Sequence, residues 1–390
     1  METLRSVSCA IALRINPRLR KKHNANLVDL QGITQVREAT YLASGAYNSI
    51  FLIKLHKPLE VSEFRSKLSP PARRLQFEHA LIPHCADPAT NSPGVDQFVL
   101  RLPFEDALLP NRITNDVAFR RFVATKLPHI PVPQVFYYQA TSQSETSFIV
   151  EEFIPCSPIS STWMSLGLAQ KHSLAYALAS IFVDLAELRF DLIGGLNPND
   201  WSSAPTVEGS KLFKGRYKFH QHDCYHIGPY KSTKEYVLAS YDKEIYYYTH
   251  ANEDIDMAFF DNVTICEFVQ RLRRKRAALA EAAIVDEPFV LAHGDFHGRN
   301  ILAQGERIVA VLDWDFAGSY PLSELLSGGD IDVVDADSEE LDEENTVWGQ
   351  EIRHYIRHVV TERCWDKTWI DLLMGSGDPE LGEVRVEMVP

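Results

Sequence analysis

The pattern of apolar and polar positions divides the chain into a strand-rich first third and a helix-rich remainder. Apolar runs of strand length lie at 38–56, where two arms flank a turn of small residues, and at 97–103 and 147–154. Short apolar runs bounded by turn residues are typical of buried strands. Residues 130–139 contain prolines that exclude a helix, so this segment is also predicted to be extended.

Apolar residues recur at helical spacing in most of the later segments, and at 115–127 in the first third. Helices are therefore predicted at 115–127, 169–189, 262–284 and 347–374. Asn115 is a plausible N-cap for the first of them. Residues 200–260 are mixed and rich in Tyr and His, so no element is predicted there. A run of strands followed by a run of helices favours an α+β fold.

The chain of 390 residues is long enough for two lobes. We predict a basic tail at 1–30, an N-terminal lobe at 31–155 and a helical C-terminal lobe at 156–390. Residues 57–96 have little periodicity, and we interpret them as a long loop or insertion within the first lobe. A structureless loop of this length is unusual inside a compact domain.

The stretch LAHGDFHGRNILAQGERIVAVLDWDFAG, at 291–318, predicts a hairpin that carries polar groups at its open end. Two apolar arms flank Gln304-Gly305, and glycine is typical of such a turn. A turn centred near residue 305 would put Asn300 opposite Val311 or Leu312. Asp313 would then emerge beside Asn300, with Asp295 on the loop that enters the hairpin.

This set of side chains suits phosphoryl transfer. A small cluster of oxygen ligands favours a hard cation such as Mg²⁺, and an additional Asp can orient or deprotonate a hydroxyl. Phosphoryl transfer needs positioning and charge neutralisation more than covalent chemistry. Two alternatives are weaker. A zinc site using His297 would need a second cluster of His or Cys, and the D-W-D at 313–315 could belong to a glycosyltransferase.

The two motifs together carry a resemblance to a known family. HGDFHGRN matches H-x-D-x-x-x-x-N and resembles the catalytic loop of the aminoglycoside phosphotransferase and choline kinase-like families. LDWDFAG resembles their metal-binding segment. The resemblance implies a two-lobed, protein-kinase-like α+β fold, with Asp295 as catalytic base and Asn300 and Asp313 as Mg²⁺ ligands. His293 would be a structural member of the loop, and Asp315 an auxiliary acid or a surface group.

The same resemblance implies a nucleotide site in the N-terminal lobe. SGAYNS, with Gly45 and Asn48, occupies the position of the loop over the ATP phosphates. Arg101, in the middle of an apolar strand, would be the cation that contacts the phosphates. Asp116 would be its acidic partner, where the family usually has Lys and Glu. Arg is not equivalent to Lys, although the fungal members that this chain resembles commonly have it here.

Two further features of this lobe follow from the resemblance. Main-chain groups from Glu152 to Ile154 would contact the adenine. Asp116 also has a local alternative partner, Arg120, at i,i+4 on its own helix. The resemblance covers about 38–56 and 97–325, and 57–96 remains outside it.

Composition and charge limit the partners. The net charge of −14 argues against nucleic-acid binding, which needs a basic surface. The six cysteines are scattered, which favours a reducing compartment, and no apolar run approaches the length of a membrane span. We predict a cytoplasmic protein. The N-terminal residues 1–22 are basic and amphipathic, so a mitochondrial transit peptide is an open alternative.

Two other segments attract attention but predict less. His220, His222, Cys224 and His226 alternate along KFHQHDCYHIGPY, a spacing too wide on a strand for one ion. A wall of the acceptor site and a partly exposed strand or loop are both open interpretations. The acidic run at 330–345 is expected to be a solvated loop, with recognition of a cationic acceptor as the alternative.

The predicted function is ATP- and Mg²⁺-dependent phosphorylation of a hydroxyl on a small molecule. The alternative is a catalytically inactive nucleotide-binding or regulatory protein with a kinase-like fold. The acceptor and the oligomeric state do not follow from the sequence.

Overall fold

The computed structural model describes residues 36–45, 47–68, 94–104, 108–199, 201, 216–251, 260, 263–285, 287–327 and 329–375. The predicted basic tail at 1–30 lies outside these residues. The chain divides into two compact units. The first comprises Met1–Val117 and Pro133–Pro155, and the second comprises Ala118–Val132 and Cys156–Pro390.

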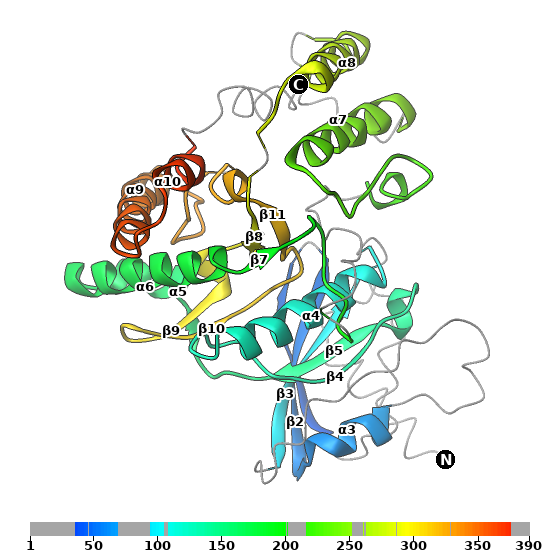
Figure 1. The fold of residues 1–390 in the computed structure, drawn as a ribbon. Coiled ribbons are helices and arrows are strands. Elements are labelled where there is room, and N and C mark those ends of the chain that lie inside the picture. Colours follow the sequence, from blue (N-terminus) through cyan, green and yellow to red (C-terminus); the bar gives the residue numbers. More distant parts are fainter. Residues whose placement is uncertain are drawn as a thin grey trace. The chain divides into compact units, whose positions relative to one another are not determined.

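The first unit is built on a five-stranded sheet with the strand order β1-β2-β3-β5-β4 (Figure 1). Every neighbouring pair is antiparallel. The strands are β1 (Val36–Ser44), β2 (Asn48–Leu59), β3 (Val95–Pro103), β4 (Val135–Gln139) and β5 (Phe148–Glu152). These bounds confirm the strands that the sequence predicted. Short apolar runs form strands here because their side chains are buried between the sheet and the elements that cover it.

A short helix, α3 (Val61–Leu68), covers part of this sheet. Its Phe64 is fully buried and its ring lies 5.3 Å from that of Phe98 and 5.6 Å from that of Phe136. The interpretation of 57–96 as a loop is therefore wrong where the structure describes this range. One buried aromatic residue anchors the helix, which is too few for a visible period. Residues 69–93 lie outside the described residues.

Helix α4 (Asn111–Lys126) begins four residues before the predicted start at 115. Asn115 is only 1% exposed and lies inside the helix, so its prediction as an N-cap is wrong. The first turn follows Pro110, and the Thr114 N–H donates to the Pro110 carbonyl at 3.2 Å. Most residues of this first turn are polar, so the apolar periodicity of the sequence does not reveal that the helix already begins here.

The second unit is mainly helical. Its principal helices are α6 (Leu168–Ala186), α7 (Thr233–His250), α8 (Ile265–Glu281), α9 (Glu339–Glu362) and α10 (Lys367–Leu373), with the short α5 (Ile159–Thr162) before them. Two three-stranded sheets have the orders β10-β9-β6 and β11-β8-β7. Their strands are β6 (Ser157–Pro158), β7 (Arg189–Phe190), β8 (Phe289–Ala292), β9 (Ile301–Gln304), β10 (Arg307–Val311) and β11 (Gly318–Pro321). The α+β class is confirmed.

Two helices of this unit differ from expectation. Helix α7 lies in the segment for which no element was predicted, because its buried face is made of Tyr and Val among many polar residues. Helix α9 begins inside the acidic run, where the Ser338 hydroxyl caps the Leu341 N–H at 3.4 Å. Acidic side chains in the first turn of a helix interact favourably with the helix dipole. The expectation of a solvated loop over 330–345 is therefore wrong from residue 339 onward.

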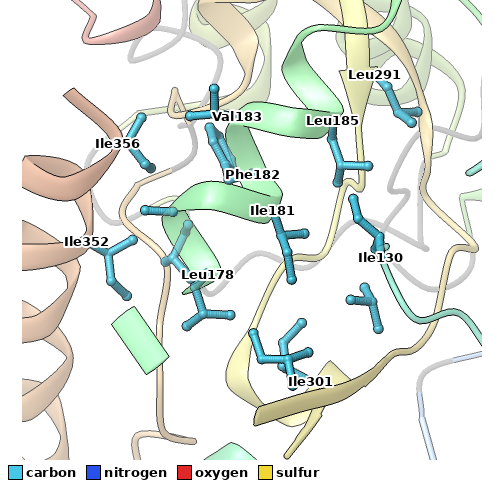
Figure 2. Close-up of a cluster of buried hydrophobic side chains, with 14 of the residues drawn as sticks. Ile130, Leu178, Ile181, Phe182, Val183, Leu185, Leu291, Ile301, Ile352 and Ile356 are labelled. Atoms are coloured by element: carbon cyan, nitrogen blue, oxygen red, sulfur yellow. The ribbon is translucent and has the colours of Figure 1, made fainter. Parts of the chain in front are cut away.

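Apolar side chains of the β9–β10 hairpin are part of the core of the second unit, which holds the hairpin in place. Figure 2 shows Leu178 and Ile181 of α6 toward Ile301 of β9, Leu185 of α6 toward Leu291 of β8, and Ile352 and Ile356 of α9 on the other side of α6. Each fully buried side chain of this size stabilises the fold by about 1.5–3 kcal/mol. The described residues contain no helix long and apolar enough to cross a membrane.

Candidate active site

The hairpin β9–β10 has the predicted form, with its turn one residue later than expected. Gln304 pairs with Arg307, so the connecting residues are Gly305 and Glu306. Gly305 has a φ of 62°, a conformation that glycine adopts without strain. The Leu312 N–H donates to the Asn300 carbonyl at 2.7 Å. Of the two predicted partners of Asn300, Val311 and Leu312, the structure has Leu312.

Asp295 and Asn300 are brought together at the open end of this hairpin. The Asn300 Nδ2 group donates to the Asp295 Oδ2 atom and to the Asp295 carbonyl, each at 2.9 Å. Both residues are buried, at 8% and 7% exposure. Because both partners are acceptors, the orientation of the Asn300 amide is fixed. Its Oδ1 atom then points away from Asp295 as an oxygen that a cation could use.

Asp313 follows Leu312 directly and has a φ of 59°, in the left-handed region. This conformation is uncommon for residues other than glycine, and such strain often occurs at functional sites. The Leu312 carbonyl accepts a hydrogen bond from His293 Nε2 at 2.9 Å. Both main-chain groups of Leu312 are therefore held, and they fix the backbone from which Asp313 extends.

His293 connects the two motifs. Its Nδ1 atom accepts from the Asp295 N–H at 3.3 Å, while Nε2 donates to Leu312. The two bonds require the neutral tautomer with its proton on Nε2. Its ring also lies 4.5 Å from the Trp314 ring, and Trp314 is fully buried. These contacts agree with the structural role expected for His293.

Gly294 allows the two loops to approach closely. It has a φ of 79°, and an added Cβ atom would lie 2.2 Å from the Phe316 carbonyl oxygen. Gly305 shares the positive φ, but an added Cβ atom there meets nothing within 4 Å. Comparing alanine substitutions at the two positions therefore distinguishes the free-energy cost of a left-handed backbone from the cost of a steric collision.

We expect Gly294→Ala to lower the thermal unfolding midpoint far more than Gly305→Ala. The left-handed conformation costs about 1–2 kcal/mol in either variant. Only Gly294→Ala adds a collision with the backbone of Phe316. To relieve it, the segment that carries Asp313 would have to shift. Differential scanning calorimetry of both variants tests this, and equal shifts of the midpoint would contradict it.

Arg299 and His297 lie beside the Asp295 carboxylate, a role that was not predicted for either residue. Arg299 Nη2 donates to Asp295 Oδ1 at 2.9 Å, and His297 Nε2 lies 3.7 Å from the same oxygen. The i,i+4 spacing of Asp295 and Arg299 was the available signal. The described residues contain no cluster of three or more His, Cys, Asp or Glu that could hold a metal ion.

Asp315 is 4% exposed, so its interpretation as a surface group is wrong. The fully buried Trp314 before it and the buried Phe316 after it carry this short segment into the core.

In the first unit, Arg101 and Asp116 form the predicted pair. Arg101 Nη1 lies 3.0 Å from Asp116 Oδ2 and 4.0 Å from Glu151 Oε2. The Arg101 side chain is 5% exposed and that of Asp116 is fully buried. Glu151 was not among the predicted residues. Ile149 of β5 lies opposite Arg101, and Glu151 is two residues further along the same strand, so both point to the same face of the sheet. The register of the sheet, and not the sequence, therefore reveals Glu151.

The other predicted nucleotide residues lie at the ends of this sheet. The Gly45 N–H donates to the Asn48 carbonyl at 3.0 Å, at the tip of the β1–β2 hairpin. Glu152 ends β5, and its N–H donates to the Gln134 carbonyl at 2.8 Å while its carboxylate accepts from the Gln134 N–H at 3.1 Å. Ile154 follows in the extended segment after β5 and is half-buried.

The His-rich segment after residue 218 is not a strand. Residues 221–225 form turns, and the His220 ring bonds to the Tyr225 hydroxyl. This segment is therefore a loop, and its interpretation as a wall of the acceptor site stays a prediction. Arg216, just before this segment, pairs with Glu244 of α7 at 2.8 Å and lies 3.7 Å from the centre of the Tyr247 ring, also of α7.

Comparison with known proteins identifies the family. A family model described as "APH: Phosphotransferase enzyme family" matches residues 89–343. No curated protein matches the chain in sequence.

Several solved structures resemble the chain more weakly. A thermostable mutant of aminoglycoside phosphotransferase APH(4)-Ia has 13% identity and a TM-score of 0.43, with 90% of this chain and 93% of that chain covered. ADP-bound aminoglycoside phosphotransferase APH(2'')-Ib has 16% identity and a TM-score of 0.44, with 91% and 93% covered. Similarity at this level adds nothing to the family match. That match spans both motifs of the hairpin and well over half of the sequence, and the chain belongs to the phosphotransferase enzyme family.

Proposed function

We propose that this protein transfers the γ-phosphoryl group of ATP to a hydroxyl group of a small molecule, with Mg²⁺ as the required ion. The observation that carries the proposal is the hydrogen bond between Asn300 and Asp295 at 2.9 Å, with Asp313 directly after Leu312, whose N–H donates to the Asn300 carbonyl. An acidic base, an amide oxygen and a second carboxylate are the side chains that this reaction requires. Membership of a phosphotransferase family supports the same reaction.

In this proposal Asp295 orients the acceptor hydroxyl and takes its proton. The carboxylate is buried and its Oδ2 atom is held by Asn300, so its direction is set before the acceptor binds. A preorganised base of this kind does not have to reorganise during the reaction. Arg299 offsets the negative charge of Asp295 at Oδ1, which supports the ionised form that accepts a proton.

Asn300 and Asp313 fit a magnesium ion. Mg²⁺ prefers oxygen ligands, and proteins usually supply one or two carboxylates while phosphates and water supply the rest. The fixed amide of Asn300 presents Oδ1, and the carboxylate of Asp313 follows the held main chain of Leu312. Bound at these residues, the ion would neutralise charge on the β- and γ-phosphates.

The nucleotide would contact the first unit. Arg101, fixed by Asp116, would neutralise phosphate charge, and the hairpin tip with Gly45 and Asn48 would cover the phosphates. Main-chain groups from Glu152 to Ile154 would contact adenine. Each of these assignments rests on the family resemblance together with the Arg101–Asp116 pair.

Binding of nucleotide is expected to depend on Mg²⁺ through Asp313. We expect wild-type protein to bind ATP at least about tenfold more tightly with Mg²⁺ than with EDTA, and Asp313→Ala to lose most of that difference, because a metal ligand is removed. Isothermal titration calorimetry with and without Mg²⁺ measures this. Glu306→Ala, an exposed acid in the same hairpin, is the matched control. Equal Mg²⁺ dependence in wild type and Asp313→Ala would contradict the ligand assignment.

The substrate class requires a separate experiment. Transfer of label from γ-labelled ATP should be screened across sugars, amino sugars and amino alcohols, since the proposal requires only a hydroxyl. A labelled product that disappears in Asp295→Asn would support the proposal. The inactive alternative is favoured by Arg101 and Asp116 standing where the family usually has Lys and Glu. It predicts Mg²⁺-dependent binding of ATP without transfer to any acceptor and without hydrolysis.

A further inference from the structure

The catalytic loop is held from outside by a neighbouring segment, residues 330–335, which we call the bracing segment. The Gly298 N–H donates to the Asp332 carbonyl at 2.8 Å. Gly298 lies midway between Asp295 and Asn300 in the loop. The bond therefore fixes the backbone between the proposed base and the proposed metal ligand.

Close packing supports this bond. An added Cβ atom on Gly298 would lie 2.2 Å from the Val333 carbonyl oxygen, so the two backbones are in direct contact. Gly298 itself is buried. Val333 is fully buried and belongs to the core of the second unit. The bracing segment is thus a rigid support and not a solvated loop at this point.

One side chain of α9 holds the bracing segment in place. Asn345 Oδ1 accepts from the N–H groups of Val333 and Val334 at 2.9 and 3.0 Å, and Nδ2 donates to the Val334 carbonyl at 3.0 Å. The residue is 8% exposed. A buried amide that makes three bonds to two adjacent residues fixes their main chain, and its loss leaves those groups without partners.

The bracing segment also places two carboxylates next to the side chains that lie beside Asp295. His297 Nδ1 lies 3.5 Å from the Asp332 carboxylate, and Arg299 Nη1 lies 3.8 Å from the Asp335 carboxylate. His297 and Arg299 are the two side chains that approach Asp295 Oδ1. The segment that Asn345 holds therefore contacts the loop through its backbone and through the side chains of both His297 and Arg299.

We propose that Asn345 is a positioning residue for phosphoryl transfer, acting through Val333, Val334 and Gly298 on the geometry of Asp295 and Asn300. The inference rests on the proposed function of this site. Small displacements of a catalytic group reduce its effectiveness strongly. Loss of Asn345 should therefore impair the chemical step while leaving the nucleotide-contacting residues of the first unit unchanged.

The test compares Asn345→Ala with Ile356→Val. Ile356 is a fully buried residue of the same helix, and its shortening weakens the core without removing a hydrogen bond. We expect kcat for ATP turnover to fall by about ten- to a hundredfold in Asn345→Ala, with the KM for ATP changed little. Ile356→Val should retain kcat. Asn345→Asp keeps both acceptor bonds and loses the donor, so it should be intermediate and serves if Asn345→Ala does not fold.

Hydrogen exchange of the peptide containing residues 293–300 supplies a second readout that does not depend on activity. Exchange should rise in Asn345→Ala and stay unchanged in Ile356→Val. Unchanged exchange overturns the proposal, and so does increased exchange with wild-type kcat. If wild-type protein shows neither transfer nor hydrolysis with ATP, the proposed function fails. The bracing of the loop by Asn345 is then still decided by the exchange result alone.

Discussion

Replacing Asp295 with Asn is expected to reduce phosphoryl transfer by about 10²–10⁴-fold, the usual contribution of a positioned general base. The substitution keeps the shape of the side chain and can keep one bond with Asn300. It removes the proton acceptor and the charge that Arg299 meets at 2.9 Å. Affinity for ATP should change much less, because the residues proposed to contact the nucleotide lie in the first unit.

Steady-state kinetics with ATP and a direct binding measurement separate these two effects. Asp337→Asn is the matched control, since Asp337 is an exposed acid in the segment that precedes α9. It makes the same chemical change without touching the loop. A variant at residue 295 that kept wild-type kcat would rule out its role as base. A variant that lost ATP binding and turnover together would instead indicate a structural role for the carboxylate.

The hairpin shows what the sequence could predict. Its apolar arms, its turn glycine and the spacing of its polar residues predicted that Asn300 pairs with Val311 or Leu312, because local periodicity and turn chemistry determine register. The turn lies one residue later than predicted, and a register shift between Ile308 and Ala310 brings Leu312 opposite Asn300. Local patterns also gave the strands of the first unit and three of the predicted helices to within a few residues.

Contacts between distant segments could not be predicted in this way. Asn345 lies forty-five residues after Asn300, and its bonds depend on how α9 packs in the second unit. The acidic composition of 330–345 indicated solvent exposure, yet Val333 and Val334 within it are buried. Phe64 similarly anchors a helix through ring contacts that no periodic pattern reveals. Tertiary packing decided each of these features.

Breaking the buried pair of Arg101 and Asp116 is expected to destabilise the first unit by about 3–5 kcal/mol, the usual cost of removing one partner from a buried ion pair. Arg101→Met removes the guanidinium that lies 3.0 Å from the fully buried Asp116 and 4.0 Å from Glu151. Asp116→Leu removes the carboxylate that lies 3.0 Å from the Arg101 guanidinium. Each single variant should therefore lower the urea midpoint of unfolding, measured by fluorescence and by hydrogen exchange in β3.

The double variant Arg101→Met/Asp116→Leu separates pairing from burial. It removes both charges together, so its loss of stability should be smaller than the sum of the two single losses, as expected for groups that interact directly. Additive losses would show that the two side chains do not stabilise each other. Because the double variant should fold better than Arg101→Met, it also tests function. If Arg101 contacts the phosphates, the double variant should bind ATP at least about tenfold more weakly, which is the effect of losing about 1.4 kcal/mol of binding free energy. Wild-type affinity would restrict Arg101 to a structural role within the sheet.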